Sequence, residues 1–123
     1  MKYLVLFAAI VIGNGAFAKQ ALPFTKVDTL IKAYVQCTKD NATKLVNTTF
    51  TPEEVGEKSH TACYSKFVKL RLAAIEYFTS IAPDDKRYAA VTQAETNLSD
   101  LAKQSKFQAG QYVAKMRTSK TDP

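Results

Sequence analysis

Two cysteines carry the simplest chemistry in this chain. Cys37 and Cys63 are the only cysteines among its 123 residues. In an oxidising compartment an even pair of this kind is joined as a disulfide, whereas two separate buried thiols are the ordinary outcome in a reducing one. A bond between them closes a loop of about 27 residues and contributes roughly 3 kcal/mol to stability in the chain-entropy treatment. We therefore expect a disulfide that supplies a large part of the stability of a small domain.

Three asparagines carry the second kind of chemistry, N-linked glycosylation. Asn41, Asn47 and Asn97 are the only asparagines after residue 18, and each stands two residues before a threonine or a serine. Asn-x-Ser/Thr is the acceptor pattern for N-glycans in secreted proteins. A match at all three positions is improbable from composition alone, so the pattern favours a eukaryotic secretory pathway. A bacterial periplasmic protein with a threonine-rich loop is the alternative.

Candidate catalytic residues are few. His60 is the only histidine, and it lacks a neighbouring residue in the sequence that would orient it as a base or a ligand. Asp84 and Asp85 are adjacent at an expected helix start, where capping explains them better than acid-base chemistry between carboxylates across a cleft. The chain has no Cys/His metal spacing, phosphate loop or nucleophile elbow. We therefore expect no enzyme, no catalytic residue, no metal and no cofactor.

The C-terminal region is basic. Its cations follow one another with no acid between Leu101 and Thr121: Lys103, Lys106, Lys115, Arg117 and Lys120. Phe107 and Tyr112 lie among them, and rings beside cations can bind single-stranded nucleic acid. Antiparallel packing, however, brings Lys115 and Arg117 near the glutamates of residues 53–57, and neutralisation of that helix start is the simpler account. We expect no nucleic-acid partner.

The first residues read as a secretory signal peptide. Lys2 precedes an apolar run over residues 3–12, and Ala16-Phe17-Ala18 is a small-residue cleavage site. The run is shorter than the roughly 18 to 20 apolar residues that a membrane-spanning helix needs. We therefore expect removal of residues 1–18, no stable membrane insertion and secretion to the extracellular fluid, with the periplasm as the alternative.

Residues 19–123 suit one small helical domain with a single core. The net charge of the whole chain is +6, which favours solubility and attraction to acidic surfaces without identifying a partner. The first helix is predicted over about residues 25–39 from its apolar spacing, at Val27, Leu30, Ile31, Tyr34 and Val35.

The second helix is predicted over about residues 52–81. Thr51, Pro52 and Glu54 combine a capping hydroxyl, proline at the first helical position and a glutamate that bonds back to the cap. Pro83 ends the helix because it restricts the residue before it and lacks an amide hydrogen. The third helix follows over about residues 84–118, with fraying or a break expected near Gly110. The sequence thus predicts an all-α fold, a small antiparallel three-helix bundle with one disulfide after removal of the signal peptide.

Bundles of this kind build ligand sites between facing helices. The aromatic residues best placed to line one are Tyr34, Phe67, Tyr77, Phe78 and Tyr88. The alternative, which we favour, is that these rings fill a closed core. From the secretion signals, the lack of catalytic motifs and the helical fold, we predict a secreted non-enzymatic protein that binds an extracellular protein or a small apolar ligand. The sequence indicates no particular oligomeric state. A cationic membrane-active (antimicrobial-like) protein that acts through residues 84–118, and a periplasmic binding or inhibitor protein, are the alternatives.

Overall fold

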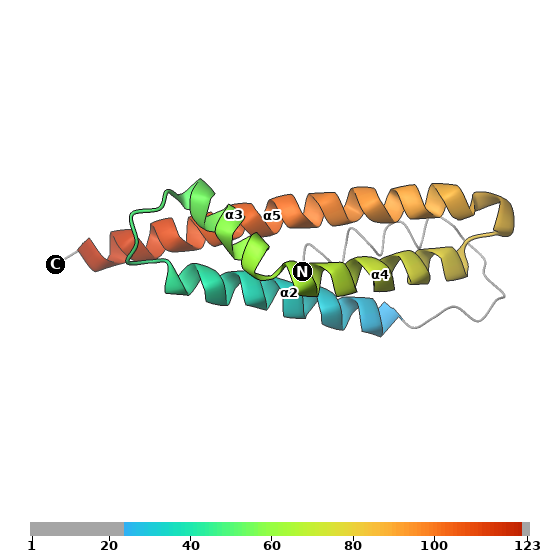
Figure 1. Cartoon of the computed structure of the whole chain (residues 1–123), viewed down its shortest axis with the longest axis horizontal. Coiled ribbons are helices and arrows are strands. Elements are labelled where there is room, and N and C mark those ends of the chain that lie inside the picture. Colours follow the sequence, from blue (N-terminus) through green and yellow to red (C-terminus); the bar gives the residue numbers. More distant parts are fainter. Residues whose placement is uncertain (1–23, 122–123) are drawn as a thin grey trace.

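The computed structural model describes residues 24–121, which form helices and no strand. In chain order these are α2 (Phe24–Lys44), α3 (Pro52–Ala62), α4 (Tyr64–Ile81), the 3-10 turn η1 (Asp84–Lys86) and α5 (Arg87–Thr121). Successive long helices run antiparallel along one elongated bundle (Figure 1). The all-α prediction is confirmed, but this part of the chain has four α-helices where the sequence predicted three. The predicted signal peptide, residues 1–18, lies outside the described residues.

Helix α2 is longer than predicted, because its buried face continues past residue 39. Thr38 and Ala42 are buried at steps of four residues from Tyr34, on the face already set by Val27 and Ile31. Residues four apart share one helix face, so this continuation keeps the chain helical to Lys44. As a consequence Asn41 lies on the helix, beyond the predicted helix end at about residue 39.

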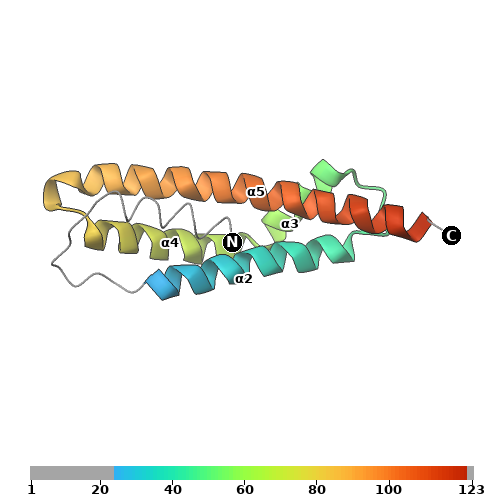
Figure 2. The ribbon, with the colours of Figure 1, turned by 180° about the vertical axis from the view of Figure 1, so that it is seen from behind.

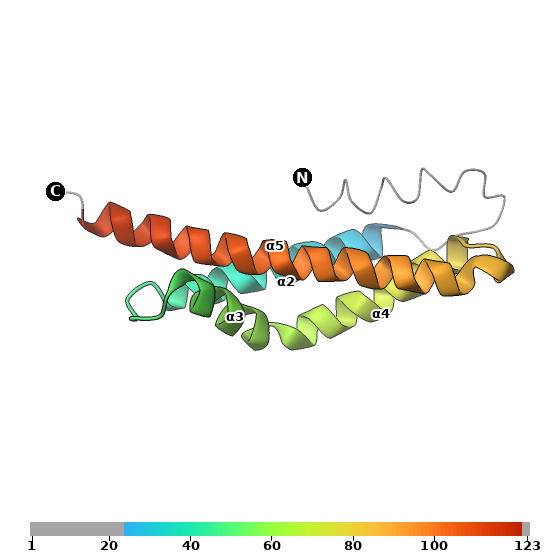
Figure 3. The ribbon, with the colours of Figure 1, turned by 90° about the horizontal axis from the view of Figure 1, so that it is seen from above.

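The predicted second helix is broken at Cys63. This residue has φ −105° and ψ 14°, and it separates α3 from α4. Figure 3 shows that the two helices meet at an angle. Sharp bends usually coincide with proline or with a glycine–serine pair, and residues 58–82 contain neither proline nor glycine. Cys63 is tied to Cys37 of α2, with the two Cα atoms 6.0 Å apart, and the predicted disulfide is thereby confirmed.

The ends of these helices follow their local sequence. Thr51 Oγ1 accepts a hydrogen bond from the Glu54 amide, and the Glu54 carboxylate accepts one from the Thr51 amide, so the predicted capping box is present. Helix α4 ends at Ile81, before Pro83. Helix α5 then runs the length of the bundle without a break at Gly110 (Figure 2). The expected break is therefore wrong.

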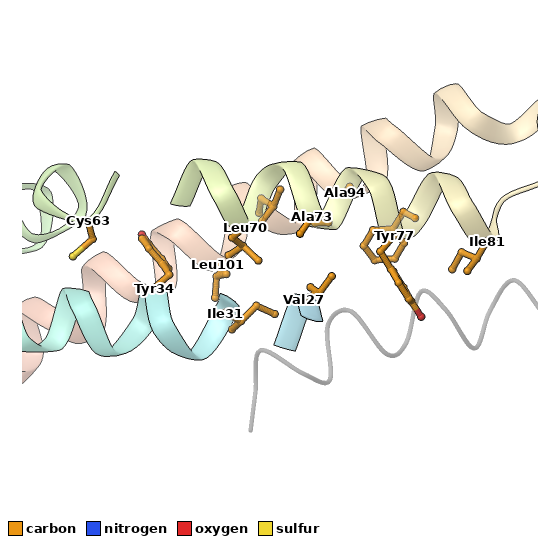
Figure 4. Close-up of a cluster of buried hydrophobic side chains, with 13 residues drawn as sticks. Val27, Ile31, Tyr34, Cys63, Leu70, Ala73, Tyr77, Ile81, Ala94 and Leu101 are labelled. Atoms are coloured by element: carbon orange, nitrogen blue, oxygen red, sulfur yellow. The ribbon is translucent and has the colours of Figure 1, made fainter. Parts of the chain in front are cut away.

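Buried apolar side chains form two separate cores. The aromatic core fills the space between α2, α4 and α5 (Figure 4) and comprises Val27, Ile31, Tyr34, Cys63, Leu70, Ala73, Ala74, Tyr77, Phe78, Ile81, Ala94, Leu98 and Leu101. The small-residue core lies toward the other end of the bundle and comprises Ala42, Val46, Val55, Ala109 and Val113. Two buried residues lie between the two cores along the helices, Thr38 on α2 and Ser105 on α5. Their hydroxyl groups are hydrogen-bonded to each other at 2.8 Å.

Candidate functional site

Helices α3 and α5 cross at two glycines. A Cβ atom on Gly56 would collide with the backbone carbonyl of Lys106, and one on Gly110 would lie 2.5 Å from the carbonyl oxygen of Pro52. Real side chains do not tolerate such contacts, so the crossing requires glycine on both helices. The first turns of α3 are thereby held directly against the second half of α5.

A groove opens beside this crossing. Its volume is about 670 Å³, within the range typical of small-ligand sites. Its lining comes from the start of α3 and one stretch of α5: Thr51, Pro52, Glu53, Glu57, Lys106, Phe107, Gly110 and Gln111. The Phe107 side chain is 66% exposed, although phenylalanine is mostly buried in folded proteins. The groove therefore offers an accessible aromatic ring beside a glycine and a proline.

The rim of the groove carries charge. Lys106 Nζ lies 2.7 Å from the Glu57 carboxylate, and this hydrogen bond lowers the pKa of Glu57 below its usual value. Glu54 lies on the same turn but is held by the Thr51 cap, whose amide and hydroxyl lower the pKa of Glu54. Glu53 also lines the groove and is exposed. An occupant of the groove would thus meet an apolar surface bordered by carboxylates and one lysine.

His60 belongs to an aromatic cluster outside this groove. Its Nδ1 lies 2.6 Å from the Tyr34 hydroxyl, and its ring contacts those of Tyr64 and Phe67 at centroid distances of 5.9 and 5.1 Å. Burial, followed by the charge of Lys106, lowers the pKa of His60, while Glu57 acts in the opposite direction. A neutral ring with its proton on Nε2 lets the Tyr34 hydroxyl donate to Nδ1. This arrangement joins α3 to α2 and gives His60 a structural role.

Four of the five aromatic residues that the sequence proposed as a ligand lining lie in or against the aromatic core. Tyr34 and Phe67 pack together beside His60. Tyr77 and Phe78 contact each other within the aromatic core, where the Tyr77 ring also meets Phe24. The Tyr88 side chain is 85% exposed. None of these five residues lines the groove between α3 and α5.

Sequence reasoning placed the start of the second predicted helix against the end of the third, but it did not predict a groove between them. Phe107 was considered as a stacking surface for nucleic acid and as part of the apolar face of the third helix, and Gly110 as a weak point in that helix. Two glycines inside helices could have indicated the crossing of α3 and α5, because each glycine costs about 1 kcal/mol of helix stability relative to alanine. Such a residue within a helix often marks a close approach of another backbone.

Arg117 lies where the sequence did not place it. Its guanidinium donates to the carbonyl oxygens of Val46, Phe50, Leu45 and Thr48 at 2.9, 2.7, 3.1 and 2.9 Å. The predicted neutralisation of the α3 glutamates by Arg117 is therefore wrong, since Lys106 pairs with Glu57 instead. The guanidinium binds the carbonyls of the connection between α2 and α3 and fixes it against the end of α5.

The three predicted glycosylation residues have different surroundings. Asn47 is exposed in the connection between α2 and α3. Asn41 is half-buried, and its Nδ2 donates to the Cys37 carbonyl at 3.1 Å and lies 3.4 Å from Cys63 Sγ. Asn97 is only 4% exposed and accepts a hydrogen bond from Gln93 through Oδ1. The sequence predicts easier modification of Asn41 and Asn47 than of Asn97, whereas in the structure Asn47 alone of the three is exposed.

Comparison of the chain with protein family models, curated proteins and solved structures finds no match. Within residues 24–121, no group of three or more His, Cys, Asp or Glu side chains is arranged to hold a metal ion. No helix in that range combines the length and apolarity needed to cross a bilayer. The geometry of the groove is therefore the basis for assigning a function.

Proposed function

We propose that this protein is a secreted, non-enzymatic helical module that binds a small apolar ligand or an apolar segment of a partner protein in the groove between α3 and α5. The observation that carries the proposal is the groove of about 670 Å³ with the 66% exposed Phe107 in its wall. Burying an exposed aromatic ring against a ligand is favourable by roughly 1.5 to 3 kcal/mol. Because the two glycines fix the crossing of the helices, this site is formed before a ligand arrives.

The non-enzymatic part of the proposal rests on the groups that line the groove. The Glu57 carboxylate is paired with Lys106, and the Thr51 hydroxyl accepts the Glu54 amide hydrogen. His60 does not line the groove. Nucleophilic catalysis requires a nucleophile within hydrogen-bond reach of a base, and these lining residues supply no such pair.

The secreted part of the proposal is supported by the disulfide. Cys37 and Cys63 are joined, and structural disulfides persist mainly in oxidising compartments. The leader-like pattern of residues 1–18 agrees with export. The bacterial periplasm has the same redox character, so a periplasmic binding or inhibitor protein is the alternative within this proposal.

Binding can be tested with a neutral fluorescent apolar probe, N-phenyl-1-naphthylamine. We expect the protein to bind the probe with saturation and Phe107→Ser to weaken binding by about tenfold, which corresponds to roughly 1.4 kcal/mol. Tyr88→Ser is the matched control, because Tyr88 is an exposed aromatic residue on the same helix but outside the groove. Equal losses in the two variants, or no saturable binding by the unmodified protein, would contradict the proposal.

A row of apolar side chains on α4 favours a second candidate function, attachment to an anionic membrane surface. Tyr64 and Leu72 are 55% and 60% exposed, and Val68 and Ile75 lie half-buried in the same row. Helical spacing places the exposed Lys69 and Arg71 on opposite sides of this row, and Arg71 is paired with Glu95 at 2.8 Å. Apolar side chains bordered by cations are typical of helices that lie in a membrane interface.

This second candidate replaces the sequence-based suggestion that the third helix acts on membranes, because Leu98 and Leu101 of α5 are buried in the aromatic core. Sedimentation with vesicles tests it. Binding to vesicles of anionic lipid but not of phosphatidylcholine, with a loss in Leu72→Ser and none in Phe107→Ser, would favour membrane attachment over the groove. No sedimentation with either lipid would exclude it.

A further inference from the structure

N-glycosylation joins a sugar to one particular atom, the side-chain nitrogen of asparagine. The Nδ2 atom attacks C1 of the first sugar of a polyprenyl diphosphate-linked oligosaccharide. The Nδ2–C1 bond forms, the bond from C1 to the diphosphate oxygen breaks, Nδ2 loses a proton to a base of the transferase, and polyprenyl diphosphate leaves. A folded protein that carries such a glycan must therefore leave space around that nitrogen, because the glycan is bulky.

Asn47 meets this requirement. It is exposed, and so is Thr49, the hydroxyl residue of its acceptor motif. The connection between α2 and α3 that displays both residues lies at one end of the bundle (Figure 1). Arg117 binds four carbonyls of this connection, and the Thr48 hydroxyl donates to the Leu45 carbonyl at 2.6 Å. These bonds hold the backbone of the connection, and the exposed position of Asn47 leaves space for a glycan on its solvent side.

Asn97 does not meet it. The residue is 4% exposed, its Nδ2 is buried, and its neighbour Leu98 belongs to the aromatic core. An oligosaccharide on that nitrogen would have to lie inside the bundle. A chain modified at Asn97 therefore cannot pack α5 as the structure shows.

Asn41 is also restricted. Its Nδ2 donates to the Cys37 carbonyl at 3.1 Å, and the same nitrogen lies 3.4 Å from Cys63 Sγ. A glycan replaces one of the two hydrogens on this nitrogen, and the attached sugar would have to lie beside the disulfide. The half-buried position of the side chain leaves little space there.

We infer that Asn47 is the single N-glycosylation site of the folded protein and that Asn41 and Asn97 remain unmodified in it. The inference rests on the proposed secretion. The inference also predicts the location of the glycan, on the connection between α2 and α3. A glycan there leaves the exposed apolar row on α4 uncovered.

The test expresses the full chain in a eukaryotic secretory host, once with its own first 18 residues and once with a leader known to work in that host. Intact mass before and after glycosidase treatment counts the glycans, and conversion of the occupied Asn to Asp identifies the position. We expect one glycan on the secreted protein, none on Asn47→Gln, and one on each of Asn41→Gln and Asn97→Gln. Thr49→Ala should also remove the glycan, because it destroys the acceptor motif while leaving Asn47 in place.

The outcomes separate this inference from the proposed secretion. A folded, secreted protein without a glycan, or with one on Asn41 or Asn97, would overturn the inference and leave secretion intact. If only the form with the substituted leader is exported and its glycan is on Asn47, the inference holds and secretion by the chain's own leader is wrong.

Discussion

The two cores of the bundle are closed in different ways. The aromatic core is filled by large side chains from three helices, such as Tyr34, Leu70 and Phe78. The small-residue core contains alanine and valine, and the nearby elements are held by backbone contact at Gly56 and Gly110 and by the bonds of Arg117 to carbonyl oxygens. One end thus depends on buried volume, and the other depends on close approach and hydrogen-bond geometry. The groove and the connection that carries Asn47 belong to the second end.

The largest expected effect is in the aromatic core. Leu70 is fully buried, so Leu70→Ala should leave a cavity and lower the free energy of unfolding by about 2 to 5 kcal/mol. Phe67 is half-buried, and Phe67→Ala should cost less than Leu70→Ala. Chemical denaturation measures both. Lys69→Ala is the control and should change stability by less than about 0.5 kcal/mol, because Lys69 is exposed. Similar losses in Leu70→Ala and Lys69→Ala would contradict the packing of α4.

Loss of the Arg117 guanidinium should have the next largest effect. Arg117→Ala removes the bonds to four carbonyl oxygens and should cost about 1.5 to 3 kcal/mol, the usual range for a hydrogen bond that involves a charged group. Arg117→Lys should recover only part of this loss, because lysine lacks the planar fork of donors. Hydrogen exchange should show faster exchange in residues 45–51 and little change in α4. Full recovery by lysine would mean that charge alone matters.

For Gly110→Ala, the direction of the change in stability tests the contact between α3 and α5. In an ordinary helix interior, glycine to alanine stabilises by about 1 kcal/mol. Here the new Cβ would lie 2.5 Å from the Pro52 carbonyl oxygen, so Gly110→Ala should destabilise by about 1 to 3 kcal/mol, as overpacking does. The same variant should weaken probe binding in the groove because α3 must move. Thermal unfolding decides the matter, and a raised melting temperature would show that the helices are not in backbone contact.

The smallest effect concerns His60, which joins α3 to α2 near the disulfide. Its pKa in the folded protein lies below the ordinary 6.5, so the unfolded chain binds the proton more readily. The contribution of His60 to stability is therefore complete above about pH 6.5 and is lost as the pH falls through the lowered pKa. We expect the melting temperature to decrease between pH 7.5 and 5.5, and less so in His60→Gln. The lowered pKa values of Glu54 and Glu57 act in a more acidic window, below 4.5. Identical pH profiles for the unmodified protein and His60→Gln would refute the assignment of this pH dependence to His60.

Much of the aromatic core followed from sequence spacing, whereas the groove did not. Val27, Ile31 and Tyr34 were found because apolar residues at helical spacing identify a buried face without knowledge of the partner helix. The close contact of Gly110 with Pro52 joins residues far apart in the chain, and periodicity carries no information about such a pair. The burial of Asn97 escaped notice for the same reason, since an acceptor motif specifies a local sequence and not a position in the fold.

The sequence by itself determined the features that act within a few residues: the Thr51 cap, the end of α4 before Pro83 and the presence of a disulfide pair. Each depends on local hydrogen bonds, restricted backbone angles or the chemistry of the side chain alone. The tertiary structure decided the break at Cys63, the continuity of α5 through Gly110 and the role of Arg117. At Cys63 one segment must reach Cys37 of α2 through its sulfur and also hold Gly56 against α5. These two distant constraints act together only in the folded chain, and a straight helix from residue 52 to 81 does not form.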